Sequence, residues 1–315
     1  MRILITGGFG YLGGRLAQYF STKTNYNIIL GTRKNPVSPE WLPQVKVVKT
    51  LWNSATDLEK ICSNVDVIVH LAGMNASDCA ENPLSALEFN GIITERLLQA
   101  ATRQGVKRFV YLSSAHVYSS PLIGRITEET CPTNLHPYAT SHRAGEDVVR
   151  YVHSRSEIEG IVIRLSNSFG APAHIKTNCW MLLINDLCVQ AITNEHMVLQ
   201  SSGGQRRDFI TLTDVCRSIE HLIILPTDKL SNGLFNVGGG WNPTILEVAQ
   251  LISNRIYALT GKKIKIQSNA LRMSPSFTDL DYITEKINTT GFELSSSVND
   301  EIDNLIRFCI KHYAL

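Results

Sequence analysis

Short apolar runs alternate with longer amphipathic segments along the first half of the chain. The runs are rich in Val, Ile and Leu without polar alternation, which is typical of strands buried on both faces of a parallel sheet. The amphipathic segments carry apolar residues at helical spacing. Strands are predicted at 3–6, 28–31, 45–48, 65–71, 109–113 and 161–165, and helices at 12–21, 55–63, 84–104 and 138–154. This order predicts an α/β fold with a Rossmann-type, doubly wound parallel sheet.

The alternation becomes less regular after residue 165. Helices are predicted at 178–193, 213–224, 244–260 and 297–312, with short extended segments near Val198 and Asn236. We expect residues 1–165 to form the Rossmann domain and residues 166–315 to form mainly a smaller C-terminal α/β domain, with segments near 205–240 returning to the first. The smaller domain is expected at the carboxyl ends of the strands, where open α/β sheets bind ligands.

A glycine-rich segment, T-G-G-F-G-Y-L-G-G at 6–14, joins the first predicted strand to the first helix. Its spacing is G-x-x-G-x-x-G, whereas the usual dinucleotide-binding motif is G-x-G-x-x-G. The glycines can nevertheless serve the same purposes. The first glycine permits a tight turn, the second allows a pyrophosphate to approach the backbone, and the third allows close packing of helix and strand. The helix N-terminus adds free N–H groups. We expect this segment to bind a dinucleotide through Gly7, Phe9, Gly10, Tyr11, Leu12 and Gly13.

The end of the second predicted strand bears on the choice of dinucleotide. An acidic residue commonly stands there in NAD-binding folds, about 20 residues after the glycines, and bonds the ribose 2′-hydroxyl. In this chain Gly31 takes that place, and Arg33 and Lys34 follow. Because a carboxylate would repel a 2′-phosphate and an arginine offers it a fork of donors, the sequence favours NADP(H) over NAD(H).

Composition narrows the class of protein. Of the 315 residues, 43% are hydrophobic and 18% charged, and the net charge is +2. Without a basic cluster there is no electrostatic reason to expect nucleic acid as a partner. Seven scattered cysteines without a C-x-x-C pair indicate free thiols rather than disulfides or a metal site. With no apolar run of membrane-spanning length and a first strand directly after Met1, we expect a cytoplasmic protein without membrane attachment.

Several further motifs occur in a characteristic order. They are Y-L-S-S-A-H-V-Y at 111–118, P-Y-A-T-S-H-R-A-G-E at 137–146, H-L-A-G at 70–73, Asn90 with Thr94, R-L-S-N-S-F-G at 164–170, R-D-F-I at 207–210, and F-N-V-G-G-G at 235–240. Together with the glycine segment, they resemble the extended short-chain dehydrogenase/reductase superfamily, in its branch of nucleotide-sugar epimerases, dehydratases and ketoreductases. The resemblance covers most of the chain.

The resemblance implies a catalytic trio of Tyr138, Ser114 and the residue at 142. Tyr138 would exchange a proton with a carbinol or ketone oxygen, and Ser114 would hydrogen-bond that oxygen. Leu71, Ala72 and Gly73 would border the cofactor. The family residue at 142 is a lysine that bonds the nicotinamide ribose and lowers the pKa of the tyrosine; here it is His142. Since imidazole is mostly uncharged at neutral pH, Tyr138 should be a weaker base, which impairs alcohol oxidation more than ketone reduction.

The resemblance also bears on the substrate. Dehydratases of this family place Asp-Glu after the active-site hydroxyl residue, whereas here Ser114 is followed by Ala115 and His116, so dehydration is not expected. Arg207 stands where nucleotide-sugar members contact the diphosphate, and a bidentate arginine suits phosphate. The candidate substrate-binding residues are His116, Asn167, Asn178 and Arg207.

The sequence leaves several functions open. The leading interpretation is an NADP(H)-dependent ketoreductase of a nucleotide-activated keto-deoxy sugar, with hydride transfer at a carbonyl assigned to C4. The alternatives are a nucleotide-sugar 4-epimerase that retains NAD, a reductase of a non-sugar ketone, and a non-catalytic NAD(P)-binding protein. The family also implies a homodimer formed by the helices near 90–104 and 138–154.

Overall fold

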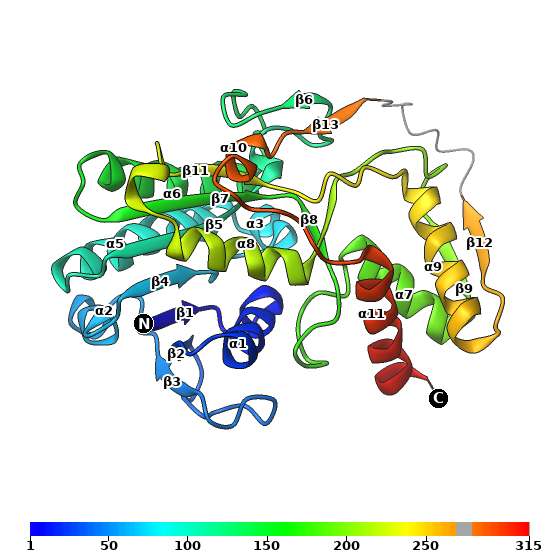
Figure 1. The fold of residues 1–315 in the computed structure, drawn as a ribbon, viewed down its shortest axis with the longest axis horizontal. Helices are drawn as coiled ribbons and strands as arrows, with labels where there is room; N and C mark the ends of the chain where they lie inside the picture. Colours follow the sequence, from blue (N-terminus) through cyan, green and yellow to red (C-terminus); the bar gives the residue numbers. More distant parts are fainter. Residues whose placement is uncertain (269–278, 315) are drawn as a thin grey trace.

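The computed structural model describes residues 1–268 and 279–314. Its centre is a seven-stranded parallel sheet in the order β11-β7-β5-β4-β1-β2-β3 (Figure 1). Its strands are β1 (Arg2–Thr6), β2 (Asn27–Thr32), β3 (Lys46–Lys49), β4 (Val67–His70), β5 (Arg108–Ser114), β7 (Glu159–Leu165) and β11 (Leu234–Val237). The predicted Rossmann-type α/β fold is therefore confirmed, and its strand order reverses between β1 and β4.

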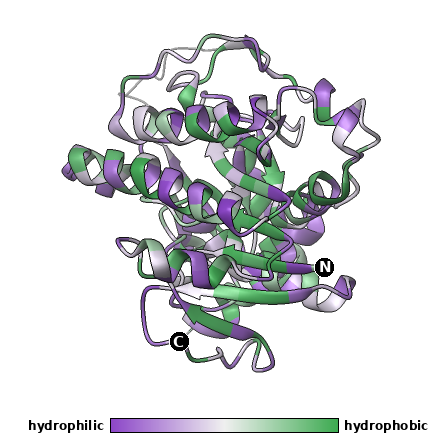
Figure 2. Cartoon of the chain, turned by 90° about the vertical axis from the view of Figure 1, so that its left-hand side faces the viewer, coloured by the Kyte–Doolittle hydropathy of each residue, from purple (hydrophilic) through white to green (hydrophobic). Residues whose placement is uncertain are grey.

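Helices cover both faces of this sheet. One face carries α1 (Tyr11–Lys23) and α8 (Leu212–Ile224), and the other carries α2 (Ala55–Cys62), α5 (Ile93–Arg103) and α6 (Pro137–Ser154). Because successive strand residues point to opposite faces, both faces of each central strand must be apolar. The central strands are accordingly hydrophobic along most of their length (Figure 2).

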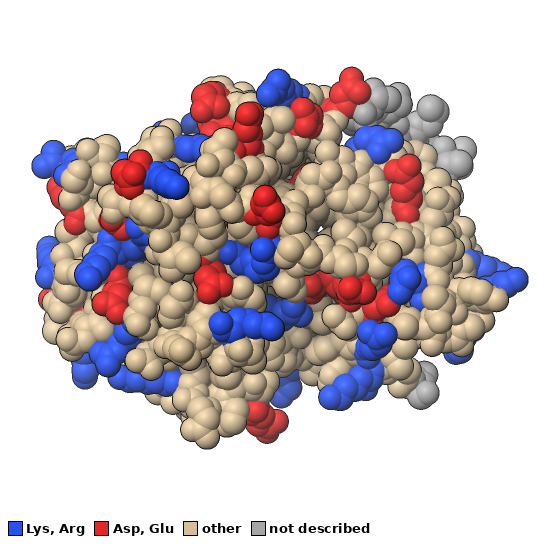
Figure 3. Space-filling view, in the orientation of Figure 1, with Lys and Arg blue, Asp and Glu red and all other residues tan. Residues whose placement is uncertain are grey.

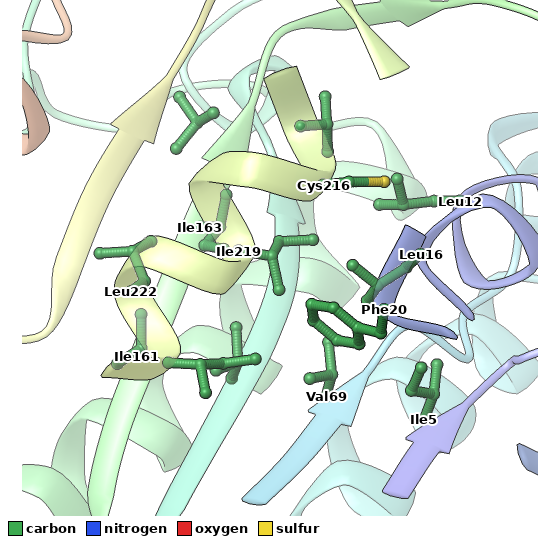
Figure 4. Close-up of a cluster of buried hydrophobic side chains, with 14 of the residues drawn as sticks. Ile5, Leu12, Leu16, Phe20, Val69, Ile161, Ile163, Cys216, Ile219 and Leu222 are labelled. Carbon is green, nitrogen blue, oxygen red and sulfur yellow. The ribbon is translucent and has the colours of Figure 1, made fainter. Parts of the chain in front are cut away.

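The core between α1, α8 and the sheet shows how the amphipathic pattern is used. Leu16 and Phe20 of α1, Ile219 and Leu222 of α8 and Ile163 of β7 belong to one cluster, in which Ile219 points toward α1 and Leu222 lies farther from it (Figure 4). All five side chains are fully buried. Removing apolar surface of this kind from water is the main favourable contribution to folding.

The predicted helix over 84–104 is continuous in the structure but changes its winding. The short helices α3 (Ala76–Glu81) and α4 (Pro83–Ala86) lead into a π-helical segment, η1 (Leu87–Ile92), and then into α5. Asn90 lies in η1; its Oδ1 accepts from the Met74 N–H at 3.0 Å, and its Nδ2 donates to Ser141 Oγ at 3.0 Å. Such π segments often occur beside functional sites, and this one ties the end of β4 to α6.

Three two-stranded parallel pairs and a separate apolar core lie outside the large sheet. The core is formed mainly by α7 (Leu183–Asn194), α9 (Ile245–Thr260) and α11 (Val298–Tyr313), on the side of the molecule away from α2 and α5 (Figure 1). The extended segments expected near Val198 and Asn236 are β9 (His196–Leu199) and β11, and β11 joins the large sheet beside β7. The remaining elements are β6 (Gly124–Ile126) paired with β13 (Leu280–Tyr282), β8 (Asn167–Phe169) paired with β10 (Phe209–Thr211), β9 (His196–Leu199) paired with β12 (Lys265–Ser268), η2 (Ala115–Val117), α7 (Leu183–Asn194), η3 (Thr227–Lys229), α9 (Ile245–Thr260), α10 (Glu285–Asn288) and α11 (Val298–Tyr313).

The helix predicted to begin at 178 begins instead at Leu183. The Leu182 N–H bonds the Cys179 carbonyl in a turn, and the Trp180 indole N–H bonds the Ile175 carbonyl. Trp180 packs against Phe308 of α11, at a ring-centroid distance of 6.0 Å. This packing holds the segment in a turn where the apolar pattern alone suggested helix.

On the face drawn in Figure 3, basic and acidic side chains are interspersed, without a large region of either sign. No helix within residues 1–268 and 279–314 is long and apolar enough to cross a membrane. All seven cysteines are unpaired, and Cys131 is exposed whereas the other six are buried. In the same described ranges, no group of three or more His, Cys, Asp or Glu side chains is arranged to hold a metal ion.

Candidate active site

The glycine turn lies at the carboxyl ends of β1 and β4. Gly7 has a φ of +67°, a conformation that glycine adopts without steric cost. The turn that follows is closed by a hydrogen bond from the Gly10 N–H to the Gly7 carbonyl, at 2.8 Å. A Cβ at Gly7 would lie 2.8 Å from the backbone of Leu71 and Ala72, and one at Gly13 would overlap the Gly7 carbonyl. The structure thus packs the predicted cofactor residues of the turn directly against those after β4.

Two side chains that follow the glycine turn, those of Leu12 and Tyr11, have structural contacts within the protein. Leu12 is buried in the core, so any contact it makes with a ligand must come from its backbone. The Tyr11 hydroxyl donates to the Gly170 carbonyl at 3.0 Å, which joins α1 to the end of β8.

An aromatic group covers the turn from the side. The Phe9 ring meets the edge of Trp41 at a centroid distance of 6.2 Å, and Trp41 stacks on His174 at 5.9 Å. His174 Nε2 lies 3.2 Å from the Phe9 carbonyl. Neither Trp41 nor His174 could be predicted from the sequence, because neither belongs to a motif and both lie in irregular segments.

The end of β2 has no room for an acidic side chain at Gly31. A Cβ there would lie 2.9 Å from Thr50 Cγ2 and 3.4 Å from Thr6 Cα. Arg33 and Lys34 follow on an exposed turn, and the Arg33 guanidinium carbon lies 5.6 Å from the centre of the Phe89 ring. The end of this strand therefore presents cations and no carboxylate from position 31.

The three predicted catalytic residues meet beside this edge of the sheet. Ser114 ends β5, and Tyr138 and His142 lie one turn apart at the start of α6. The Tyr138 and His142 rings are 4.5 Å apart, edge to face. Burial raises the pKa of Tyr138 above its usual 10, and the hydrogen bond with Ser114 lowers it only in part. Tyr138 is therefore protonated throughout the neutral range.

His142 is buried at 7% exposure, and this burial lowers its pKa to about 4. At neutral pH the ring is uncharged and provides no cation for Tyr138. Its Nδ1 lies 3.0 Å from the Tyr111 hydroxyl. A Cβ at Gly73 would lie 3.7 Å from His142 Cε1 and 4.0 Å from Nε2, so a side chain at 73 would occupy the space in front of the ring. Gly73 therefore faces the edge of the ring that carries Cε1 and Nε2.

Three of the four predicted substrate residues also lie near one another. Burial, and then the neighbouring Arg207 charge, lowers the pKa of His116, and the Asn167 side chain raises it. Asn167 Nδ2 donates to the Asp208 carbonyl at 2.9 Å, which fixes it beside the Arg207 backbone. Asn178 lies on an exposed turn, and within the described part of the chain it makes no hydrogen bond to the other three.

The two neighbouring arginines differ in their partners. Arg206 forms an ion pair with Glu247 at 3.6 Å and donates to the Asn242 carbonyl. Arg207 is half-buried and donates to Gln205 Oε1 at 3.2 Å, and no carboxylate among residues 1–268 and 279–314 pairs with it. A half-buried guanidinium without an acidic partner is available to an anionic ligand.

A buried ion pair supports the catalytic residues from behind. Glu146 of α6 accepts two hydrogen bonds from Arg164 of β7, at 3.1 Å from Nε and 2.6 Å from Nη2. Ser113, next to Ser114, donates to the same carboxylate at 2.5 Å. The Arg164 guanidinium also lies over the Tyr118 ring, 4.6 Å from its centre. This network fixes α6 against the end of β5.

Comparison with known proteins identifies the family of the chain. The model of the NAD dependent epimerase/dehydratase family matches residues 3–238. An uncharacterized UDP-glucose epimerase of Bacillus subtilis is 25% identical over 99% of both chains, and UDP-glucose 4-epimerase 4 of Oryza sativa is 28% identical over 84% of this chain and 78% of its own. Two solved structures share the fold. The epimerase Mth375 of Methanothermobacter thermautotrophicus has a TM-score of 0.83 at 23% identity, covering 99% of this chain and 93% of its own. UDP-glucuronic acid 4-epimerase of Bacillus cereus, in complex with UDP-glucuronic acid and NAD, has a TM-score of 0.81 at 20% sequence identity. The match covers 99% of this chain and 100% of its own. On the match to its family model, the chain belongs to the NAD dependent epimerase/dehydratase family of extended short-chain dehydrogenases/reductases.

Proposed function

We propose that this protein is an NADP(H)-dependent ketoreductase that reduces a carbonyl, assigned to C4, of a nucleotide-activated keto-deoxy sugar. The observation that carries the proposal is the packing of Tyr138 on His142, with ring centroids 4.5 Å apart, in surroundings that raise the pKa of the tyrosine and lower that of the histidine. A reductase needs a tyrosine that gives a proton to the carbonyl oxygen, and Tyr138 has that proton at neutral pH. A reaction that begins with alcohol oxidation needs the tyrosine as a base, which this environment disfavours.

Each residue of the site has a defined part in this reaction. When bound, the nicotinamide supplies the hydride to the carbonyl carbon. Ser114 holds the carbonyl oxygen by a hydrogen bond, and Tyr138 donates its proton to that oxygen as negative charge develops. His142 holds the nicotinamide ribose through Nε2. The residues of the turn from Gly7 to Gly13 offer backbone N–H groups to the pyrophosphate.

The substrate class follows from the other side of the site. Arg207 lacks an acidic partner in the described ranges and lies near His116 and Asn167, so we assign it to the diphosphate of the nucleotide. His116 has a buried Nδ1 without a partner in the same ranges, which leaves it a polar atom for a sugar hydroxyl. The relatives named for UDP-glucose support a nucleotide-sugar substrate.

A 4-epimerase is the second candidate, because the relatives are named as epimerases and a similar structure holds NAD. Such an enzyme keeps its dinucleotide bound, oxidises the sugar and reduces it again, so no cofactor is consumed. The raised pKa of Tyr138 and the neutral His142 weaken the first of these steps. A reductase of a non-sugar ketone and a non-catalytic NAD(P)-binding protein stay as further alternatives.

A panel assay tests the proposal. Purified protein is incubated with NADPH or NADH and with UDP- and dTDP-linked 4-keto-6-deoxy sugars, and nicotinamide absorbance is followed. We expect NADPH oxidation only with the nucleotide-linked ketones. Equal rates with simple ketones that lack a nucleotide would remove the assigned substrate class, and dinucleotide that copurifies in stoichiometric amount would favour the epimerase.

Cofactor preference is expected to depend on Arg33. Arg33→Ala should weaken NADPH binding roughly tenfold or more and leave NADH binding nearly unchanged, because a charge-assisted contact with the 2′-phosphate contributes about 1.5–3 kcal/mol. Fluorescence titration of both dinucleotides measures this. If the unsubstituted protein binds NADPH and NADH equally, Arg33 does not select the cofactor.

Arg207 and Arg206 form a matched pair for testing the substrate assignment. Arg207→Gln should raise the KM for a nucleotide sugar about 10-fold or more through loss of a charge-assisted phosphate contact. Arg206→Gln removes the same charge one residue away, but that guanidinium already pairs with Glu247, so KM should change little. Steady-state kinetics of both variants measure the two KM values. An equal rise in KM in both variants would indicate only a long-range charge contribution and would contradict the assignment of Arg207.

We also propose a homodimer, formed by the outer surface of η1 and α6. The apolar residues Leu97, Leu98 and Ala101 of α5 are buried within the chain, as are Val149 and Val152 of α6, whereas Val148 of α6 is half-buried. The exposed apolar side chains nearby are Leu84 (78%), Leu87, Ile92 and Tyr151. Light scattering should give twice the chain mass at micromolar concentration, and Ile92→Asp should shift the mass toward the monomer. A monomeric unsubstituted protein contradicts this assembly.

A further inference from the structure

Tyr111 of β5 is a second tyrosine in contact with His142, with a ring-centroid distance of 5.9 Å. It is 2% exposed, and its hydroxyl lies 3.0 Å from His142 Nδ1 and 3.4 Å from the Asn90 carbonyl. Gly145 of α6 makes room for it: a Cβ there would overlap the Tyr111 hydroxyl and lie 2.6 Å from the Asn90 carbonyl. Glycine disfavours helix, so its place inside α6 is explained by this close approach.

The donors and acceptors around that hydroxyl can be counted. Tyr111 has one proton to donate, and three polar groups surround its hydroxyl: His142 Nδ1, the Asn90 carbonyl and Thr94 Oγ1. Thr94 Oγ1 gives its own proton to the Asn90 carbonyl at 2.7 Å, and that carbonyl lies 3.4 Å from the Tyr111 hydroxyl. The shorter contact is to His142 Nδ1. A hydroxyl proton that points to the nearer partner, Nδ1, makes Nδ1 the unprotonated nitrogen of the ring.

We infer that Tyr111 is a positioning residue, whose hydroxyl donates to His142 Nδ1 and so holds the ring in the tautomer that presents an Nε2–H donor toward Gly73. The neutral state of the ring, set by burial, leaves it a single N–H, so fixing one nitrogen fixes the other. Within the described ranges, no group accepts a hydrogen bond from Nε2, and a Cβ at Gly73 would lie 4.0 Å from that nitrogen.

An N–H donor at His142 Nε2 would replace the hydrogen-bond donor of the lysine expected at position 142, but not its positive charge. Nε2–H can donate to a ribose hydroxyl, as an ammonium group would, but it brings no positive charge to Tyr138. The inference rests on the proposed function for the identity of the acceptor, a ribose oxygen of the dinucleotide. The tautomer itself is a property of the protein without ligand.

The decisive experiment is nitrogen NMR of ¹⁵N-histidine-labelled protein without cofactor, with the His142 signals identified by their loss in His142→Gln. We expect a protonated Nε2 and a bare Nδ1 in the unsubstituted protein. In Tyr111→Phe this preference should be lost, and NADPH affinity should fall roughly 2- to 10-fold, as for loss of one neutral hydrogen bond. Tyr19→Phe is the matched control, since its hydroxyl bonds Glu220 between α1 and α8 and should change neither reading.

A protonated Nδ1 in the unsubstituted protein would overturn the inference, and this result does not depend on whether Tyr111→Phe folds. An unchanged tautomer in a folded Tyr111→Phe would also overturn it. If the tautomer is as expected but no keto sugar is reduced, the proposed function fails while the positioning role of Tyr111 stands.

Discussion

Replacing Tyr138 by Phe is expected to slow ketone reduction about 10²–10⁴-fold, the usual contribution of a positioned general acid. The ring and its edge-to-face contact with His142 are retained, so NADPH affinity should stay close to that of the unsubstituted protein. Single-turnover kinetics with saturating NADPH separate the two effects. Unchanged turnover in Tyr138→Phe would show that another group donates the proton.

The same environment predicts how each direction of the reaction depends on pH. Burial keeps Tyr138 protonated, and His142 becomes charged only near its pKa of about 4. Reduction should therefore be nearly constant between roughly pH 6 and 8, whereas alcohol oxidation should rise toward alkaline pH as the tyrosine loses its proton. His142→Lys should speed oxidation more than reduction, because a nearby cation lowers the pKa of Tyr138. Equal acceleration of both directions would contradict the role given to the neutral ring.

Glu146→Gln is expected to lower the free energy of unfolding by about 3–5 kcal/mol, because it leaves Arg164 charged and unpaired in the interior. The Arg164 and Glu146 side chains are only 4% and 1% exposed. Chemical denaturation measures the change. As a control, Glu59→Gln breaks the exposed pair with Arg103, whose arginine is 61% exposed, and should cost about 1 kcal/mol or less. Similar losses in both variants would show that the buried network is not specially stabilising.

The order of strands and helices could be predicted because the first half follows one rule. Each strand of the large sheet is buried on both faces, so its apolar run stands out against amphipathic helices. The predicted start of α7 was wrong because Trp180 and its apolar neighbours continue the helical pattern of the sequence. In the structure they form a turn, and Trp180 packs against α11. The change of winding in η1 depends on contacts of Asn90 with β4 and α6, which no local pattern records.

The candidate site was predictable where motifs are contiguous. The glycine turn, the residues after β4, and Ser114 with Tyr138 and His142 all lie at one edge of the sheet because parallel strands end there together. Tyr111 was missed because its distance from His142 arises only when β5 packs on α6, although Gly145 inside that helix was a local sign of close approach. Asn178 was assigned from a segment that the structure places on an exposed turn.

The central claim is that the site gives a hydride and a proton to a ketone and does not carry out a balanced oxidation and reduction. The most direct test is the stoichiometry with a nucleotide-linked 4-keto sugar and NADPH deuterated at the transferred position. The account predicts one NADPH oxidised for each alcohol formed, with deuterium on the former carbonyl carbon. Interconversion of C4 epimers of a nucleotide sugar, with no net change in nicotinamide absorbance and no deuterium entering from added NADPH, would contradict it.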